Sequence, residues 1–308
     1  MKRFALILQA FFCLSLTSFA APPRAAHVFI ISFDQGSPSG IEKSAMPLFK
    51  TMVAEGAHTW EAYTIVPSLT LPSHTSMLTG VGIQKHQILW NDYNPAKGVV
   101  QVPTIFSIAK EHGLTTAMFV AKEKFKTLEL PGSVDAFVVA EPPTAKSVAD
   151  AFAAQVGTLK PGLCFIHFGD PDATGHKYGM ESPEKMQAFA DCDAALKIIR
   201  SAIDAAGLTD SSVILVTADH GGHDVPEMKD GKATGKTLGA HGLPDTSDVV
   251  IPWVAWGKGV KRGATITAPV VIYDTAATAL WLLGIDVPEG FWGRPVASAF
   301  EPERPASR

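Results

Sequence analysis

The chain has no excess of basic residues. Its 308 residues hold 26 Lys and Arg against 30 Asp and Glu, for a formal net charge of −4. Without Lys2 and Arg3 the balance becomes 24 against 30, or −6. A nucleic-acid-binding protein needs a basic face, and this composition gives no sign of one. Arginine is absent from a long stretch, with none between Arg24 and Arg200.

Long apolar runs are absent after residue 20. Before it, Lys2 and Arg3 precede a mostly apolar stretch, 4–16, and small residues precede Ala21. This is the pattern of a secretory signal peptide over 1–20, and the run is short of the ~20 residues that a membrane span needs. We therefore expect a secreted or periplasmic protein with no membrane span after signal removal. The sequence does not indicate an oligomeric state.

Cysteine is also scarce, with three in the chain and one of them, Cys13, in the signal segment. Cys164 lies in an apolar run and Cys192 on an apolar helix stripe. Either a disulfide or two buried thiols fits this pattern.

What remains is a regular alternation of apolar strands and helices. Strands are expected over 27–33, 114–120, 136–140, 163–168, 213–216 and 249–256, and helices over 46–55, 103–111, 145–159, 183–206 and 273–283. Nearly continuous apolar strands indicate an α/β fold, a three-layer sandwich whose central, mostly parallel sheet is covered by helices on both faces. We expect one catalytic domain over 21–300 and a frayed tail over 301–308. Pro252 suggests an edge position for 249–256, and the polar segment 224–239 suggests a surface excursion.

Acidic and imidazole side chains gather where strands end. Three aspartates follow apolar strands and three histidines lie in the loops beside them: Asp34, Asp172, Asp219, His176, His220 and His241. Ligands of parallel sheets collect at this edge. Carboxylate and imidazole ligands suit zinc, and six of them are too many for one tetrahedral ion and suit two. Two neighbouring ions clamp the attacking and leaving oxygens of a phosphoryl transfer.

Thr70 lies at the start of a short expected helix in Thr70-Leu71-Pro72-Ser73-His74. A helix start favours an anion, so that a hydroxyl there could attack an anionic substrate if a base or metal activated it.

This ordered set resembles the alkaline phosphatase superfamily, and within it the nucleotide pyrophosphatase/phosphodiesterase (type I phosphodiesterase) branch. The resemblance implies an alkaline-phosphatase-like fold in which Thr70 is the nucleophile and becomes phosphorylated. It implies that Asp34, Thr70, Asp219 and His220 hold one zinc ion. The other zinc ion is then held by Asp172, His176 and His241.

The substrate contacts depart from that branch. An aromatic residue often follows the nucleophile there, where this chain has Leu71, and Ser73 stands where an asparagine is expected. Ser73, Asn91 and Tyr93 are candidates for contact with the substrate, although 90–93 also fits a surface turn. His223 is a candidate for orienting a ligand from behind the metal site.

Charge favours a monoanionic substrate. Two zinc ions balance three aspartates and a deprotonated threonine, so that a second substrate charge needs a further cation. The nearest in sequence is Lys85. We therefore expect a hydrolase of phosphodiesters or nucleotide pyrophosphates with two zinc ions, although other divalent ions are possible. A phosphomonoesterase or phosphonate hydrolase of the same superfamily is the first alternative, and a non-catalytic metal-containing binding protein is the second.

Overall fold

The computed structural model describes residues 24–302. The expected signal peptide and most of the expected tail therefore lie outside the described residues. Within 24–302, no helix combines the length and apolar character that a membrane crossing requires.

An eight-stranded sheet forms the centre of the molecule, in the order β10-β2-β9-β6-β1-β5-β3-β4. Its strands are β1 (His27–Phe33), β2 (Ala57–Tyr63), β3 (Thr116–Val120), β4 (Ala136–Val139), β5 (Leu163–Phe168), β6 (Ser212–Ala218), β9 (Val250–Gly257) and β10 (Ala264–Thr265). Strand β9 runs antiparallel to both of its neighbours, and the other pairs are parallel. The expected mostly parallel sheet is confirmed.

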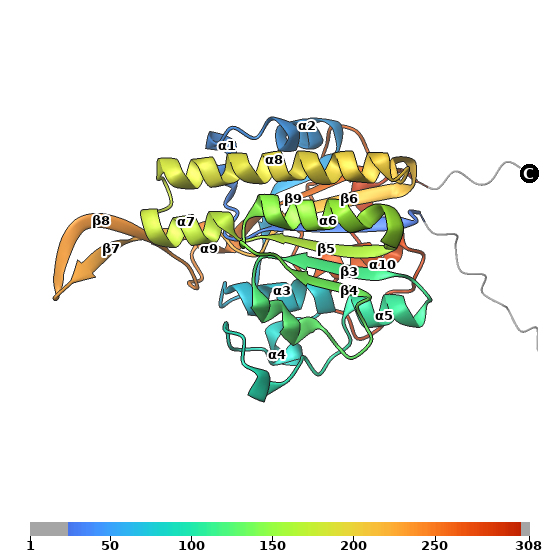
Figure 1. Cartoon of the computed structure of the whole chain (residues 1–308), viewed down its shortest axis with the longest axis horizontal. Helices are drawn as coiled ribbons and strands as arrows, with labels where there is room; N and C mark the ends of the chain where they lie inside the picture. Colours follow the sequence, from blue (N-terminus) through green and yellow to red (C-terminus); the bar gives the residue numbers. More distant parts are fainter. Residues whose placement is uncertain (1–23, 303–308) are drawn as a thin grey trace, which may run out of the picture.

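Helices cover both faces of this sheet (Figure 1). The helices on one face are α1 (Pro38–Lys43), α2 (Pro47–Glu55), α6 (Ala145–Leu159) and α8 (Pro183–Ala205). Those on the other are α3 (Thr70–Thr79), α5 (Ile105–Glu111) and α10 (Asp274–Leu282). Strand β1 shows why: Phe29 and Ile31 pack in one core, whereas Val28 and Ile30 pack in the other. The three-layer α/β sandwich is therefore as expected.

The edge position expected for residues 249–256 is wrong, because β9 lies inside the sheet between β2 and β6. Pro252 has no N–H to donate, but the register of β2 against β9 shifts between Thr59 and Ala62, opposite this proline. The bulge means that no ladder hydrogen bond from Pro252 is required.

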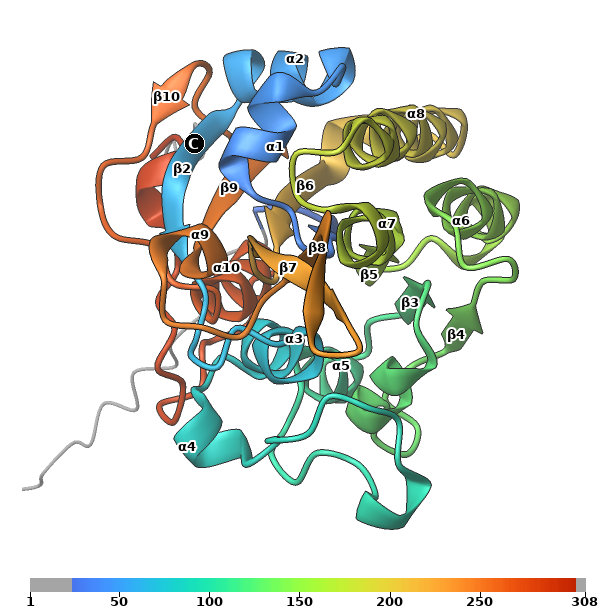
Figure 2. The same ribbon diagram turned by 90° about the vertical axis from the view of Figure 1, so that its left-hand side faces the viewer.

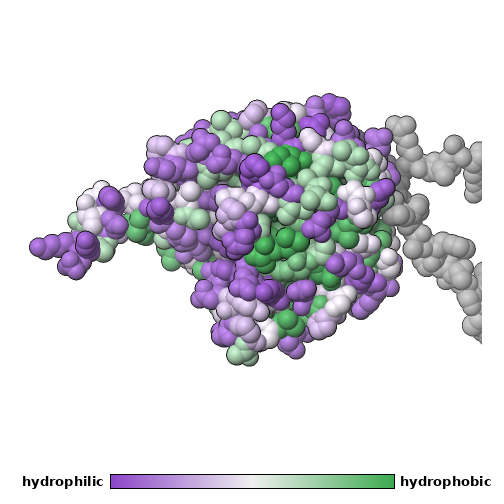
Figure 3. All heavy atoms as spheres, in the orientation of Figure 1, coloured by the Kyte–Doolittle hydropathy of each residue, from purple (hydrophilic) through white to green (hydrophobic). Residues whose placement is uncertain are grey.

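The surface excursion expected over 224–239 is an ordered hairpin. Strands β7 (His223–Lys229) and β8 (Lys232–Ala240) pair antiparallel and project from the body of the molecule (Figure 1). Its tip is polar (Figure 3). The segment is exposed, as its composition predicts, but it is regular because its two strands satisfy each other's backbone groups.

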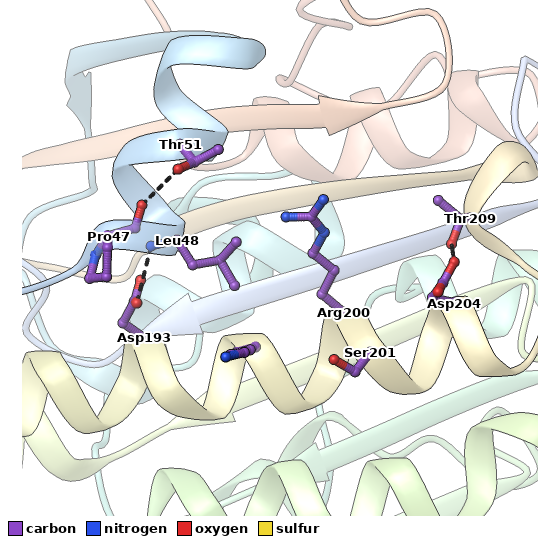
Figure 4. A pocket seen from close by; sticks show the side chains of 9 residues that line it. Pro47, Leu48, Thr51, Asp193, Arg200, Ser201, Asp204 and Thr209 are labelled. Atoms are coloured by element: carbon purple, nitrogen blue, oxygen red, sulfur yellow. Dashed lines mark hydrogen bonds between the residues drawn. The ribbon is translucent and has the colours of Figure 1, made fainter.

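Helix α2 is fastened to α8 by a buried carboxylate. Asp193 of α8 accepts hydrogen bonds from the backbone N–H groups of Leu48 and Phe49 at 3.1 and 2.7 Å. Figure 4 shows the bond from Leu48. These are free donors of the first turn of α2. A groove of about 530 Å³ opens beside this contact. None of the six Asp and His residues expected to bind metal lines this groove.

Cys164 and Cys192 are free and buried in the part of the chain that the structure describes. The alternative of buried thiols therefore holds, and burial raises the pKa of both well above its ordinary value.

Candidate metal centre

Five segments meet at one edge of the sheet, where β1, β2, β3, β5 and β6 all end; Figure 2 looks onto this edge. Because parallel strands bring their carboxyl ends together, residues far apart in the sequence become neighbours. Asp34 follows β1, Asp219 follows β6, and Asp172 lies in α7 (Asp170–Tyr178) after β5. Thr70 begins α3, and Lys122 follows β3.

One cluster consists of Asp34, Asp219 and His220, whose ligand atoms lie within 4.8 Å of one another. All three side chains are fully buried. The Thr70 hydroxyl lies 3.5 Å from Asp34 Oδ1 and 3.4 Å from His220 Nε2. The structure thus brings together the four residues that the resemblance assigned to one zinc ion.

A second cluster consists of Asp172, His176 and His241, again with ligand atoms within 4.8 Å. Nε2 of His176 lies 3.2 Å from Asp172 Oδ1 and 3.2 Å from His241 Nε2. The spacing of four residues places Asp172 and His176 on one face of α7. The His241 ring stacks on His220 of the first cluster with centroids 3.8 Å apart, so that the two clusters adjoin.

The hydrogen bonds of these imidazoles fit metal ligation. Each ring places its Nδ1 2.8–2.9 Å from a backbone carbonyl oxygen. The pairs are His176 with Gly239, His241 with Ser68, and His220 with Gly221. Each Nδ1 must therefore carry the proton, which leaves a lone pair on each Nε2.

These lone pairs face other lone pairs. The Nε2 atoms of His176 and His241 point at each other, and buried Asp172 Oδ1 and Asp219 Oδ2 have no hydrogen-bond donor among the described residues. Such an arrangement is repulsive unless cations lie between the groups, so the donor set fits divalent metal ions.

Lys122 is a site residue that the sequence did not reveal. Its ammonium lies 2.6 Å from Asp34 Oδ2 and 2.5 Å from Asp172 Oδ2, and so connects the two clusters. Lys85, the nearest candidate cation in the sequence, is exposed and donates to the carbonyl of Gly290. Lysine after a strand carries no signature, so only the fold distinguishes Lys122.

The pKa shifts follow from burial and from Lys122. Burial alone would raise the pKa of Asp34, but Lys122 and a hydrogen bond from His167 hold it well below its ordinary value. Burial, reinforced by the charge of Asp34, raises the pKa of Asp219 well above its ordinary value. Burial lowers the pKa of His220 to about 3, which keeps this imidazole neutral and available as a ligand.

Two further buried histidines support the first cluster. His167 of β5 is buried and places Nε2 2.9 Å from Asp34 Oδ2. His74 donates from Nδ1 to the backbone carbonyl of Thr70 at 2.8 Å, which helps to fix the first turn of α3. Sequence spacing pointed to neither role, because each depends on contacts between segments or on the exact start of α3.

The four residues that the sequence suggested for substrate contact or for orienting a ligand lie in different surroundings. Asn91 Oδ1 accepts a hydrogen bond from the N–H of Leu71, the residue after Thr70, at 2.8 Å, so Asn91 lies at the site. Ser73 is buried and its hydroxyl accepts from Thr64 at 3.1 Å. Tyr93 is partly exposed, with the Lys126 ammonium 5.5 Å from its ring centroid. The roles of Ser73 and Tyr93 in substrate contact stay predictions.

His223 donates from Nδ1 to Asp248 at 2.7 Å. The backbone carbonyl of Asp248 in turn accepts from the N–H of Gly221, next to His220. His223 therefore reaches the first cluster through Asp248 and not by a direct contact with a ligand.

Comparisons with known proteins agree with this geometry. The family model of type I phosphodiesterase/nucleotide pyrophosphatase matches residues 28–271. Ectonucleotide pyrophosphatase/phosphodiesterase family member 7 of Rattus norvegicus is 24% identical over 217 residues, which cover 63% of this chain and 49% of that protein. This chain thus spans about half the length of the curated relatives it matches.

Solved structures show the same fold. An inactive form of murine ectonucleotide pyrophosphatase/phosphodiesterase 5 in complex with AMP has a TM-score of 0.71 at 16% identity and covers 89% of this chain and 100% of that one. A mutant of the alkaline phosphatase PafA has a TM-score of 0.70 at 12% identity, with 91% and 100% covered.

Proposed function

Because this chain belongs to the type I phosphodiesterase/nucleotide pyrophosphatase family, we propose that it hydrolyses phosphate esters with two bound divalent ions and a phosphorylated Thr70. The family membership is as predicted from the sequence. The observation that carries the proposal is the position of the Thr70 hydroxyl, 3.5 and 3.4 Å from ligand atoms of the first cluster. The second cluster adjoins it, because the ring of His241 in the second cluster stacks on the ring of His220 in the first.

The residues divide the work as follows. Asp34, Asp219 and His220 would hold one ion, with Thr70 beside it, and Asp172, His176 and His241 would hold the other. Zinc suits these ligands best. When bound, the ions supply Lewis-acid stabilisation of the attacking and leaving oxygens.

Thr70 itself forms the new bond. Its hydroxyl loses its proton as the oxygen attacks phosphorus, the bond from phosphorus to one ester oxygen breaks, and that oxygen leaves as an alcohol after taking up a proton. Water then attacks phosphorus, the bond to the Thr70 oxygen breaks and Thr70 regains its proton, which releases a phosphomonoester from a diester substrate or phosphate from a monoester. The first turn of α3 offers free backbone N–H groups and the positive end of the helix dipole to the anionic phosphoryl group. Full burial of α3 keeps the nucleophile in place.

Thr70→Ala tests the nucleophile. Turnover should disappear, because Thr70 carries the hydroxyl that contacts Asp34 and His220 of the first cluster, whereas zinc should still bind to the remaining ligands. The measurements are hydrolysis of bis-p-nitrophenyl phosphate and metal content after gel filtration. Activity retained by the variant would contradict the proposed covalent intermediate.

Family membership favours phosphodiesters or nucleotide pyrophosphates as substrates, and we propose these as the first substrate class. Lys122 supports phosphomonoesters as a second candidate, because its ammonium supplies the extra positive charge that a dianion needs. Burial and the charge of Lys122 lower the pKa of Lys124, two residues further along the chain, and the charge of Asp34 opposes this shift.

Lys122→Met separates the two substrate classes. If Lys122 contacts the substrate, the variant should lose activity on p-nitrophenyl phosphate about tenfold more than on bis-p-nitrophenyl phosphate, since one close charge–charge contact is worth about 1–2 kcal/mol in a partly wet site. An equal loss on both substrates would show that Lys122 does not distinguish substrates by their charge.

The expected signal peptide leads us to propose a periplasmic or secreted location.

A further inference from the structure

Lys185 is a lysine of α8 that is completely buried. It forms no ion pair in the part of the chain that the structure describes, which is unusual because a buried charge is costly unless it is paired. Its ammonium donates to the backbone oxygens of Gln35 and Pro171 at 3.3 and 3.2 Å and to the side-chain oxygen of Gln35. Three N–H donors thus meet three oxygen acceptors.

The acceptors adjoin ligands of two different clusters. Gln35 follows Asp34 and donates its own backbone N–H to Asp219 at 3.1 Å, so it contacts the first cluster. Pro171 precedes Asp172 of the second cluster. A single side chain therefore connects the loop after β1 to the first turn of α7.

The packing around this connection leaves no spare room. A Cβ atom added at Gly175 of α7 would lie 2.8 Å from Lys185 Nζ and would overlap the side chain of Gln35. Burial lowers the pKa of Lys185 to about 8, against the opposing effect of Asp172, Asp34 and Asp219. The amine thus stays protonated at neutral pH and keeps all three donors.

We propose that Lys185 is a positioning residue that holds the two metal-ligand clusters at a fixed separation by tying Gln35 to Pro171. The proposal rests on the proposed function, since it assumes that both clusters bind metal. Among the described residues, Lys185 donates no hydrogen bond to a side chain of either cluster, and it acts through Gln35 and Pro171, the chain neighbours of Asp34 and Asp172.

A purely electrostatic role for Lys185 predicts that metal binds more tightly when its charge is removed. Lys185 carries a positive charge near three site carboxylates, so that removal of the charge alone would make the site more negative and bind cations more tightly. Loss of a positioning contact behind a metal site instead weakens metal affinity, typically by 10–100-fold. The direction of the change therefore distinguishes the two roles.

The test is Lys185→Met, which keeps the length and apolar stem of the side chain. Zinc affinity is measured by competition with a chromophoric chelator, and zinc stoichiometry by elemental analysis. We expect affinity to fall 10–100-fold, and excess zinc to restore hydrolysis with the half-saturating zinc concentration raised by the same factor. Lys197→Met is the matched control, because Lys197 lies on the same helix, is exposed, and lines the groove beside α2. It should bind zinc like the wild type.

Unchanged or tighter zinc binding by Lys185→Met would overturn the proposal. If that variant does not fold, Gln35→Met keeps the ammonium and removes one acceptor, and it should also bind zinc more weakly; unchanged affinity there overturns the proposal as well. Wild-type protein that binds no zinc would overturn the proposed function and this inference together. Normal wild-type binding with an unaffected Lys185→Met would overturn the inference alone.

Discussion

Replacing Lys122 with methionine should destabilise the metal-free protein and leave the zinc-loaded protein nearly unchanged. Without metal, the Lys122 ammonium is the direct countercharge to Asp34 and Asp172, at 2.6 and 2.5 Å. The same two carboxylates are the expected metal ligands. Bound cations would therefore replace what the substitution removes, and the penalty should appear only when metal is absent.

The magnitude follows from burial. The side chains of Asp34 and Asp172 are 0% and 7% exposed, and that of Lys122 is 22% exposed. Removal of one partner from a buried ion pair costs about 3–5 kcal/mol, and the partial exposure of Lys122 favours the lower end, about 3 kcal/mol. At about 2 °C per kcal/mol for a chain of this size, the melting temperature should fall by about 6 °C.

The assay is thermal unfolding followed by circular dichroism, in EDTA and in zinc. Lys110→Met provides the control, because Lys110 also pairs with an aspartate, Asp135 at 2.7 Å, but both side chains are about one-third exposed. Its effect should stay within about 1 kcal/mol in either buffer. An equal loss in EDTA and zinc for Lys122→Met, or no loss in EDTA, would refute the reasoning.

Two further predictions concern stability. His86 accepts the N–H of Ile88 on Nδ1, and burial lowers its pKa to about 4, so it stays neutral in the folded state while the unfolded chain takes up a proton below pH 6.5. The stability that the neutral imidazole contributes is complete above pH 6.5 and is lost as the pH falls toward 4. Urea titrations at pH 7.5 and 5 should therefore show that the free energy of unfolding falls by about 1–2 kcal/mol less in His86→Gln than in the wild type. An equal fall in both proteins would contradict this. Asp193→Ala should cost about 1–2 kcal/mol in the same titration at pH 7.5, since the first turn of α2 loses its acceptor, and a change below about 0.5 kcal/mol would speak against that capping role.

The metal-ligand clusters were accessible from sequence for a physical reason. A buried parallel strand appears as a short apolar run, so that an Asp or His directly after it can be assigned to the edge where ligands gather. Asp34 after β1 and the Asp219-His220 pair after β6 carry this signal. His241 does not follow such a strand, and it entered only through the order of the motifs.

The residues that sequence missed act across long distances in the chain. Lys122 contacts one carboxylate that follows β1 and another in α7, and Lys185 reaches Gln35 from a helix 150 positions away. No local periodicity records such contacts. The interior position of β9 was missed for a related reason, because the bulge that accommodates Pro252 belongs to the partner strand β2 and not to β9 itself.

In the proposed mechanism, fixed charge outside the ligand set decides the substrate class. Two divalent ions would balance three aspartates and the Thr70 oxygen, so the ligands would leave a neutral site. A phosphodiester carries one negative charge and a phosphomonoester about two. Lys122 adds one positive charge beyond the ligand set, which is the further cation that the second charge of a phosphomonoester needs. Burial and the charge of Lys122 lower the pKa of Lys124, two residues further along the same segment. Preference between the two substrate classes should therefore depend on the segment after β3, at residues 122 and 124, more than on any ligand.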